Sequence, residues 1–244
     1  MSLVVHSLPA LKDNFIYVLA DPHTAEAVVI DPGDAAPVEA FLKAKKLKLT
    51  QILCTHHHQD HIAGAARLSQ TFDAPMTCSS FDLHRIQGAS LGLEDGQSVS
   101  VLGEKMQAIA VPGHTDGQIA LWFKDLGWLF AGDTIFSGGC GRLFEGSFAQ
   151  MFASLDRLKK LPLKTAIYFG HEYTVNNMKF VLQTAKDPQL LIAAQNHLAE
   201  CEAKLLHGQQ TTPTTLEREL QVNPFLMATT LEDFTFWRQA RNTW

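Results

Sequence analysis

The chain has 244 residues and a formal net charge of −5, and 46% of its residues are hydrophobic, as in an ordinary globular protein. Its length suits one large domain, or one domain with a smaller appendage. The mildly acidic balance argues against a broad nucleic-acid surface. No apolar run approaches the ~20 residues that span a bilayer. The start lacks the features of a signal peptide, and the four cysteines are scattered, so we expect reduced thiols and a cytoplasmic location.

Strand and helix patterns alternate along the first two thirds of the chain. We expect strands over residues 3–8, 15–20, 27–31, 50–54, 97–102, 106–111, 119–123, 128–131 and 165–169, and a short one after residue 74. We expect helices over residues 35–46, 62–72, 80–86 and 148–160. Beyond residue 172 the strand signals stop, and the sequence predicts two helices divided at Pro188, a polar linker over 209–215 and a final helix over 230–241. This order predicts a layered α/β architecture followed by a helical region.

A dense group of metal-ligand side chains follows the predicted strand 50–54. Residues 55–61 are Thr-His-His-His-Gln-Asp-His. Alternate residues of an extended segment point the same way, so His56 and His58 can share one ion, and His57 points elsewhere. Asp60 and His61 lie on the turn into the next helix, which favours a second ion. Such a cluster would be costly to bury without metal.

Three later turns, each at the end of a predicted strand, carry further ligand types: His114, Asp133 and His171. Seven ligands exceed the needs of one tetrahedral ion, so two ions that share a carboxylate fit better. Nitrogen and oxygen donors without thiolate suit zinc, iron or manganese. A purely structural metal is disfavoured, because structural sites are usually closed cages with cysteine.

Other reactive side chains receive simpler interpretations. Cys140 has no histidine close by in the sequence, so we do not expect it to act as a nucleophile. The isolated histidines are expected on the surface or in the core; they are His6, His23, His84, His197 and His207.

The ligand motif and the three turns resemble the metallo-β-lactamase superfamily, whose fold is an αβ/βα sandwich with metals at one edge. Segments 138–146 (Gly-Gly-Cys-Gly-Arg-Leu-Phe-Glu-Gly) and 170–174 (Gly-His-Glu-Tyr-Thr) resemble, more specifically, its glyoxalase II (hydroxyacylglutathione hydrolase) family. The resemblance covers essentially the whole chain. It implies a catalytic domain over 1–172 and a helical, substrate-binding C-terminal domain over 173–244.

The resemblance also implies roles for individual residues. One metal, most directly zinc, would be held by His56, His58 and His114. A second would be held by Asp60, His61 and His171, with Asp133 bridging; Asp60 and Asp133 would be the catalytic carboxylates. The substrate would contact Arg142, Phe144, Tyr173, Arg238 and Arg241. Phe144 stands where many relatives have Tyr, and Arg241 where they often have Lys.

The activity that the resemblance implies is hydrolysis of glutathione thioesters by a metal-bridged hydroxide. The expected substrate is S-D-lactoylglutathione, which gives D-lactate and glutathione in methylglyoxal degradation. We expect a monomer that binds this small molecule and neither nucleic acid nor membrane. The alternative is a glutathione persulfide dioxygenase with a single iron, which has a similar fold and first motif; the long tail with Arg238 and Arg241 speaks against it.

Overall fold

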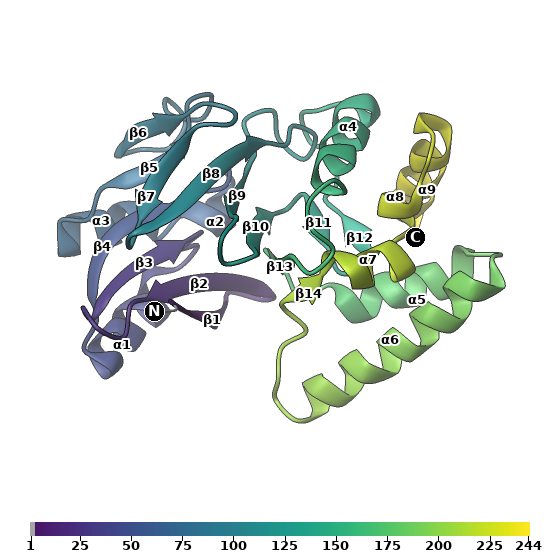
Figure 1. Cartoon of the computed structure of the whole chain (residues 1–244), viewed down its shortest axis with the longest axis horizontal. Coiled ribbons are helices and arrows are strands. Elements are labelled where there is room, and N and C mark those ends of the chain that lie inside the picture. The colour runs from purple at the N-terminus through teal and green to yellow at the C-terminus, as the bar shows by residue number, and fades with distance from the viewer. Residues whose placement is uncertain (1–2) are drawn as a thin grey trace. The chain divides into compact units, whose positions relative to one another are not determined.

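The computed structural model describes residues 3–244, and its elements divide between two compact units (Figure 1). Among the described residues, the first unit comprises 3–110 and 117–126. The second comprises residues 111–116 and 127–244. No helix in the described part of the chain is long and apolar enough to cross a membrane.

The first unit is built on a six-stranded sheet in sequential order. Its strands are β1 (Val4–Ala10), β2 (Asn14–Ala20), β3 (Glu26–Ile30), β4 (Lys48–Leu53), β5 (Met76–Ser79) and β6 (Ala89–Leu93). The first three are antiparallel neighbours, and β3 to β6 are parallel. Parallel neighbours bring their carboxyl ends to one edge of the sheet, so the residues after β3 and β4 meet there. The antiparallel strands β7 (Ser98–Val101), β8 (Glu104–Ala110) and β9 (Ile119–Phe123) complete this unit.

Helix α1 (Ala35–Lys45) connects β3 to β4 and packs one face on the core. The side chain of Asp34 accepts a hydrogen bond from the Ala36 amide and caps the helix start. Val38 and Leu42, four residues apart, are fully buried, as the sequence predicts. The apolar spacing of residues 35–46 also predicts that this face extends to position 44 or 45, which is wrong, because both positions are exposed.

Two helix predictions in this unit need correction. The expected helix over 62–72 is two helices, α2 (Gln59–Ile62) and α3 (Ala65–Phe72). They are separated at Gly64, where a Cβ would lie only 2.5 Å from the Ala35 nitrogen. The expected helix over 80–86 is a series of turns, and the strand β6 that follows was not predicted.

The second unit combines short strands with most of the helices. Its strands are β10 (Trp128–Gly132), β11 (Ile135–Phe136), β12 (Gly139–Cys140), β13 (Ala166–Phe169) and β14 (Thr214–Thr215). Strands β10 and β13 pair in parallel, and β11 and β12 form a small hairpin. Its helices are α4 (Phe148–Leu158), α5 (Thr174–Thr184), α6 (Pro188–Leu206), α7 (Leu216–Val222), α8 (Pro224–Met227) and α9 (Leu231–Thr243).

The predicted helices on both sides of Pro188 are confirmed, as are α4 and α9. Pro188 occupies the first turn of α6, where its missing amide hydrogen costs nothing, and Asp187 caps that helix. The short elements α7, α8, β11, β12 and β14 were not predicted. Phe180, Phe225 and Phe234 pack together in the core of this unit.

His197 on α6 is a buried core histidine, as its sequence context predicts. It is 7% exposed, and its Nε2 lies 2.8 Å from the Ser137 hydroxyl. Burial, followed by the charge of Arg218, lowers the pKa of His197 from 6.5 to about 4.

The depressed pKa of His197 makes the protein sensitive to acid. Below pH 6.5 the unfolded chain binds a proton at this residue and the folded chain does not, so stability falls as the pH drops toward 4. We expect this residue to remove about 3 kcal/mol of unfolding free energy over that range. Denaturant unfolding of the wild type and His197→Gln at pH 7.5 and 4.5 tests this. The wild type should lose more stability than the variant; equal losses would contradict the assignment.

Candidate functional site

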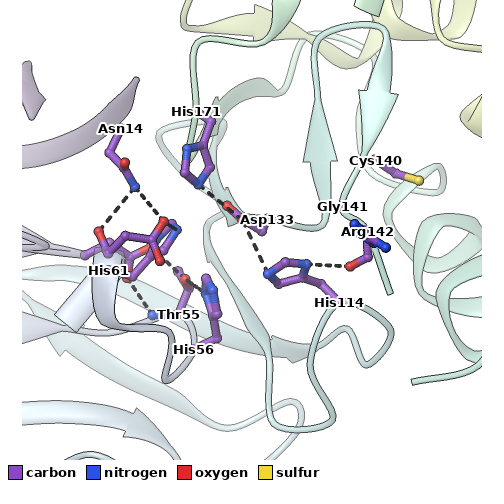
Figure 2. Close-up of polar contacts among 12 residues, drawn as sticks. Asn14, Thr55, His56, His61, His114, Asp133, Cys140, Gly141, Arg142 and His171 are labelled. Carbon is purple, nitrogen blue, oxygen red and sulfur yellow. Dashed lines mark hydrogen bonds and ion pairs between the residues drawn. The ribbon is translucent and has the colours of Figure 1, made fainter. Parts of the chain in front are cut away.

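The first group of predicted metal ligands lies at the carboxyl end of β4 (Figure 2). His56 is fully buried, and its ring lies 4.8 Å from that of His58 and 4.2 Å from that of His61. His58 precedes α2 in an extended conformation, and Asp60 and His61 lie in the first turn of that helix. The chain therefore gathers the three predicted imidazoles of this segment in one place.

Asp31, which follows β3, contacts Thr55 and His61 of this segment through its carboxylate. Its Oδ1 accepts a hydrogen bond from the Thr55 amide (2.7 Å) and its Oδ2 one from the Thr55 hydroxyl (2.6 Å). The same Oδ2 lies 3.1 Å from Nδ1 of His61. His56 Nδ1 lies 3.1 Å from the Thr55 hydroxyl, which already donates to Asp31 and therefore accepts from the imidazole. Both histidines thus carry a proton on Nδ1 and keep Nε2 available as a ligand.

Two further contacts shape this segment. The amide of Asn14, which is 5% exposed, donates to Oδ2 of Asp60 at 3.0 Å and to its carbonyl oxygen at 3.2 Å. This fixes the orientation of the Asp60 carboxylate. His57 turns to other partners, as predicted: its Nε2 accepts from Arg85 at 2.7 Å, and its Nδ1 lies 3.5 Å from Asp82.

The second group of predicted ligands lies in the second unit (Figure 2). Oδ2 of Asp133, just after β10, lies 3.4 Å from Nε2 of His114 and 3.3 Å from Nε2 of His171. All three residues are buried, with exposed fractions of 6% or less. Nδ1 of His114 donates a hydrogen bond to the carbonyl oxygen of Arg142 at 2.6 Å. As in His56 and His61, the lone pair therefore lies on Nε2. One carboxylate oxygen of Asp133 therefore lies at nearly the same distance from two imidazole nitrogens.

Four of the five predicted substrate residues gather in the second unit at a cavity of about 290 Å³. Arg142, Tyr173, Arg238 and Arg241 all line it. Its other lining residues, none of them predicted, are Phe136, Cys140, Asn177, Asn242 and Trp244. Phe144 is not among the lining residues; it is 63% exposed, with its ring 5.3 Å from that of His114.

The cavity is cationic. Three of its lining residues are arginines, and none of the nine described residues that line it is acidic. Burial, and then the neighbouring Arg238, lower the pKa of Arg241. Its guanidinium lies 4.9 Å from the ring of Trp244, which helps to fix its position. An anionic ligand is what such a cavity would bind best.

Arg238 and Cys140 have structural surroundings that the sequence did not reveal. Arg238 is 5% exposed, and its Nη1 donates to the carbonyl oxygens of Cys140 (2.7 Å) and Gly141 (3.4 Å). Burial raises the pKa of the Cys140 thiol, with Arg238 acting in the opposite direction. A buried, protonated thiol is a poor nucleophile, which agrees with the interpretation from sequence.

Comparison with protein-family models divides the chain into two consecutive matches. Residues 12–171 match the metallo-beta-lactamase superfamily, and residues 172–242 match the hydroxyacylglutathione hydrolase C-terminus. The hydroxyacylglutathione hydrolase of Bdellovibrio bacteriovorus is 42% identical over 98% of this chain and 97% of its own length. The chain belongs to the hydroxyacylglutathione hydrolase (glyoxalase II) family.

Other relatives agree with this membership. The hydroxyacylglutathione hydrolase of a Synechococcus species is 45% identical over 91% of this chain and 88% of that one. Among solved structures, ETHE1 from Myxococcus xanthus is similar with a TM-score of 0.74 and 26% identity, over 98% of this chain and 91% of that chain. The BLEG-1 B3 metallo-beta-lactamase shares the fold, with a TM-score of 0.70 and 24% identity. The match covers 92% of this chain and 100% of that chain. The predicted fold class is confirmed.

Membership of the metallo-β-lactamase superfamily implies divalent-metal binding, and the side chains of this chain fit it. In His56, His61 and His114, Nδ1 donates a hydrogen bond to an acceptor. This sets the tautomer in which Nε2 carries the lone pair that can bind a metal ion. Histidines that bind metal usually have such outer partners. Asp31, with both oxygens engaged, is best assigned to this outer set, although its carboxylate lies within 4.8 Å of ligand atoms of His56 and His61.

Proposed function

We propose that this chain hydrolyses glutathione thioesters, with S-D-lactoylglutathione as the substrate and D-lactate and glutathione as products. The observation that carries the proposal is that two residues lining the cationic cavity contact side chains of the second ligand group. The Arg142 carbonyl holds His114, and the Tyr173 ring stacks on His171 at 4.8 Å, while both residues line the cavity. A substrate anchored in this cavity would therefore lie beside metal ligands. The names and similarity of the relatives support the same reaction.

For the metal centre, we propose that His56, His58 and His114 hold one ion and that Asp60, His61 and His171 hold a second. Asp133 would bridge the two, and the nearly equal distances from its Oδ2 to His114 and His171 support that role. Zinc is the proposed metal, and iron or manganese would suit the same donors. Bound divalent ions lower the pKa of water toward neutrality, which supplies a hydroxide nucleophile, and polarise the thioester carbonyl.

Other residues of the chain would bind the substrate and orient the metal ligands. Arg142 and Arg241 would bind the carboxylates of the glutathione part, since guanidinium groups recognise carboxylate in a fork geometry. Tyr173 would pack against the substrate while its ring keeps His171 in place. Asn14 would hold the Asp60 carboxylate in the orientation for metal. The leaving thiolate is a weak base, so no strong general acid is needed.

Thiol release from S-D-lactoylglutathione by zinc-loaded protein tests the proposal. We expect steady thiol release, and its absence would overturn the proposed reaction. Arg241→Met should raise KM by about tenfold or more, the cost of about one charge-assisted hydrogen bond. Lys186→Met, which changes an exposed cation outside the cavity, should leave KM unchanged.

The alternative of a glutathione persulfide dioxygenase is less well supported, because residues 172–242 match the C-terminal model of the hydrolases. Oxygen uptake with glutathione persulfide, measured on iron-loaded protein, would favour the alternative. We further propose a monomer without nucleic-acid or membrane partners, in a reducing compartment such as the cytoplasm. The four cysteines, all buried free thiols in the described structure, fit that compartment.

A further inference from the structure

A buried carboxylate in the second unit belongs neither to the ligand groups nor to the cavity lining. Glu219 on α7 is 0% exposed. Its Oε1 accepts from the hydroxyls of Ser137 (2.8 Å) and Thr214 (2.7 Å). Its Oε2 accepts from the Gly138 amide (2.8 Å) and the side-chain amide of Asn223 (3.1 Å). Four donors around one isolated carboxylate make it a structural hub, since a buried charge needs such compensation.

The contacts of Glu219 and its partner Asn223 converge on residues 136–142, which include all of the β11–β12 hairpin except Ile135. Asn223 donates to the carbonyl oxygens of Phe136 (3.1 Å) and Gly139 (3.0 Å). Asn177 donates to that of Ser137 at 3.0 Å. Arg238 donates to the next two carbonyl oxygens, so side chains from α5, α7 and α9, and Asn223 between α7 and α8, all bond to the backbone of this segment.

Segment 136–142 joins the two parts of the proposed active site. Phe136, Cys140 and Arg142 line the cavity. At the far end of the segment the Arg142 carbonyl accepts from Nδ1 of His114, and at the near end the Phe136 ring lies 5.9 Å from that of His171. A shift of this segment would therefore move the substrate-binding guanidinium and a metal ligand together.

We propose that Glu219 is a positioning residue, which holds segment 136–142 so that Arg142 faces the substrate and His114 keeps its metal-binding orientation. This inference rests on the proposed function for its link to substrate. Its effect is geometric, because all four donors to Glu219 are neutral. Removal of the carboxylate takes the acceptor from the buried Gly138 amide and one of three acceptors from the Asn223 amide, and the segment relaxes to find new partners.

The chemistry of the four donors predicts a clear difference between two substitutions. The two hydroxyls at Oε1 can reverse and accept, whereas the two N–H groups at Oε2 cannot. Glu219→Gln therefore fits, with its NH₂ facing Ser137 and Thr214 and its oxygen facing Gly138 and Asn223. Glu219→Ala satisfies none of them. The amide variant should behave like the wild type, and the alanine variant should not.

The test compares these variants by substrate kinetics, by calorimetric binding of S-methylglutathione, which cannot be hydrolysed, and by amide hydrogen exchange. For Glu219→Ala we expect KM to rise and S-methylglutathione affinity to fall by about tenfold, with exchange of the Gly138 amide at least about tenfold faster. Glu219→Gln should stay within about threefold of the wild type in all three measurements. Thr77→Val removes a buried hydroxyl and its hydrogen bond from Gln51 in the first unit, and serves as a control for stability loss alone.

Equal KM and binding for Glu219→Ala and Thr77→Val would overturn the inference. So would a loss in Glu219→Gln as large as that in Glu219→Ala, since the role would then lie in the charge. If Glu219→Ala does not fold, Glu219→Asp replaces it; it should weaken S-methylglutathione binding in the same direction, and unchanged binding would overturn the inference. A wild type that binds S-methylglutathione but releases no thiol would defeat the proposed reaction, while binding and exchange would still decide the role of Glu219.

Discussion

Asp133→Asn is expected to abolish thioester hydrolysis and to remove about half or more of the bound metal. The substitution keeps the size of the side chain but replaces a carboxylate oxygen that lies 3.3–3.4 Å from Nε2 of both His114 and His171. A neutral amide cannot share a negative charge between two cations. Loss of an outer partner of a metal ligand costs about 10–100-fold, so loss of a bridging ligand should exceed about 100-fold in activity.

The measurement pairs metal analysis of the purified protein with its hydrolysis of S-D-lactoylglutathione. Asp125→Asn, a change at an exposed position, is the matched control and should retain full metal and activity. Retention of a full metal complement by Asp133→Asn would contradict the bridging role. Full metal loss with residual hydrolysis would contradict the metal-dependent reaction itself.

The grouping of the candidate ligand residues could be predicted from sequence because local rules place them. The segment containing His56 and His58 follows a buried strand, where alternation fixes which side chains share a side. His114, Asp133 and His171 each follow a strand or a tight turn, and the structure brings these three together within the second unit. Which ligands share an ion came from the family resemblance, and that assignment stays a prediction.

The outer partners could not be predicted, because they are contributed by distant parts of the chain. Asp31 reaches His61 across 30 residues and Asn14 reaches Asp60 across 46. Arg238 bonds to the carbonyl of Cys140 across 98 residues. Arg238 shows best what sequence alone cannot predict. Its position on the last helix predicted contact with substrate, but not its hydrogen bond to the backbone of Cys140.

The prediction of secondary structure from sequence was wrong where tertiary packing determines the local conformation. The helix expected over 62–72 is interrupted where Gly64 packs against the start of α1, a contact that no local pattern reveals. The short hairpin β11–β12 has only two residues in each strand, too few for a periodic signal. Its conformation depends instead on Asn177, Glu219 and Asn223, which lie 40 to 87 residues further along the chain.

Gly141→Ala should disrupt the second ligand group through backbone crowding alone. A Cβ at this position would overlap the carbonyl oxygen of Asp133 and lie 3.0 Å from Nδ1 of His114. The overlapped atom is backbone, so no side-chain rotation relieves it, and one added methyl must displace a predicted ligand. We expect unfolding free energy to fall by about 2–3 kcal/mol, as for other overpacked sites, together with loss of metal.

Gly103→Ala is the matched control for Gly141→Ala. Its added methyl meets no atom within 4 Å, although the positive φ of +81° carries a cost of about 1 kcal/mol. Denaturant unfolding and metal analysis of the two variants separate backbone strain from crowding at the ligands. If Gly141→Ala kept its metal and lost no more stability than Gly103→Ala, the close packing of segment 136–142 against Asp133 and His114 would be refuted. If Gly141→Ala loses metal and Gly103→Ala does not, the cause is crowding beside the ligands, since the substitution removes no polar group.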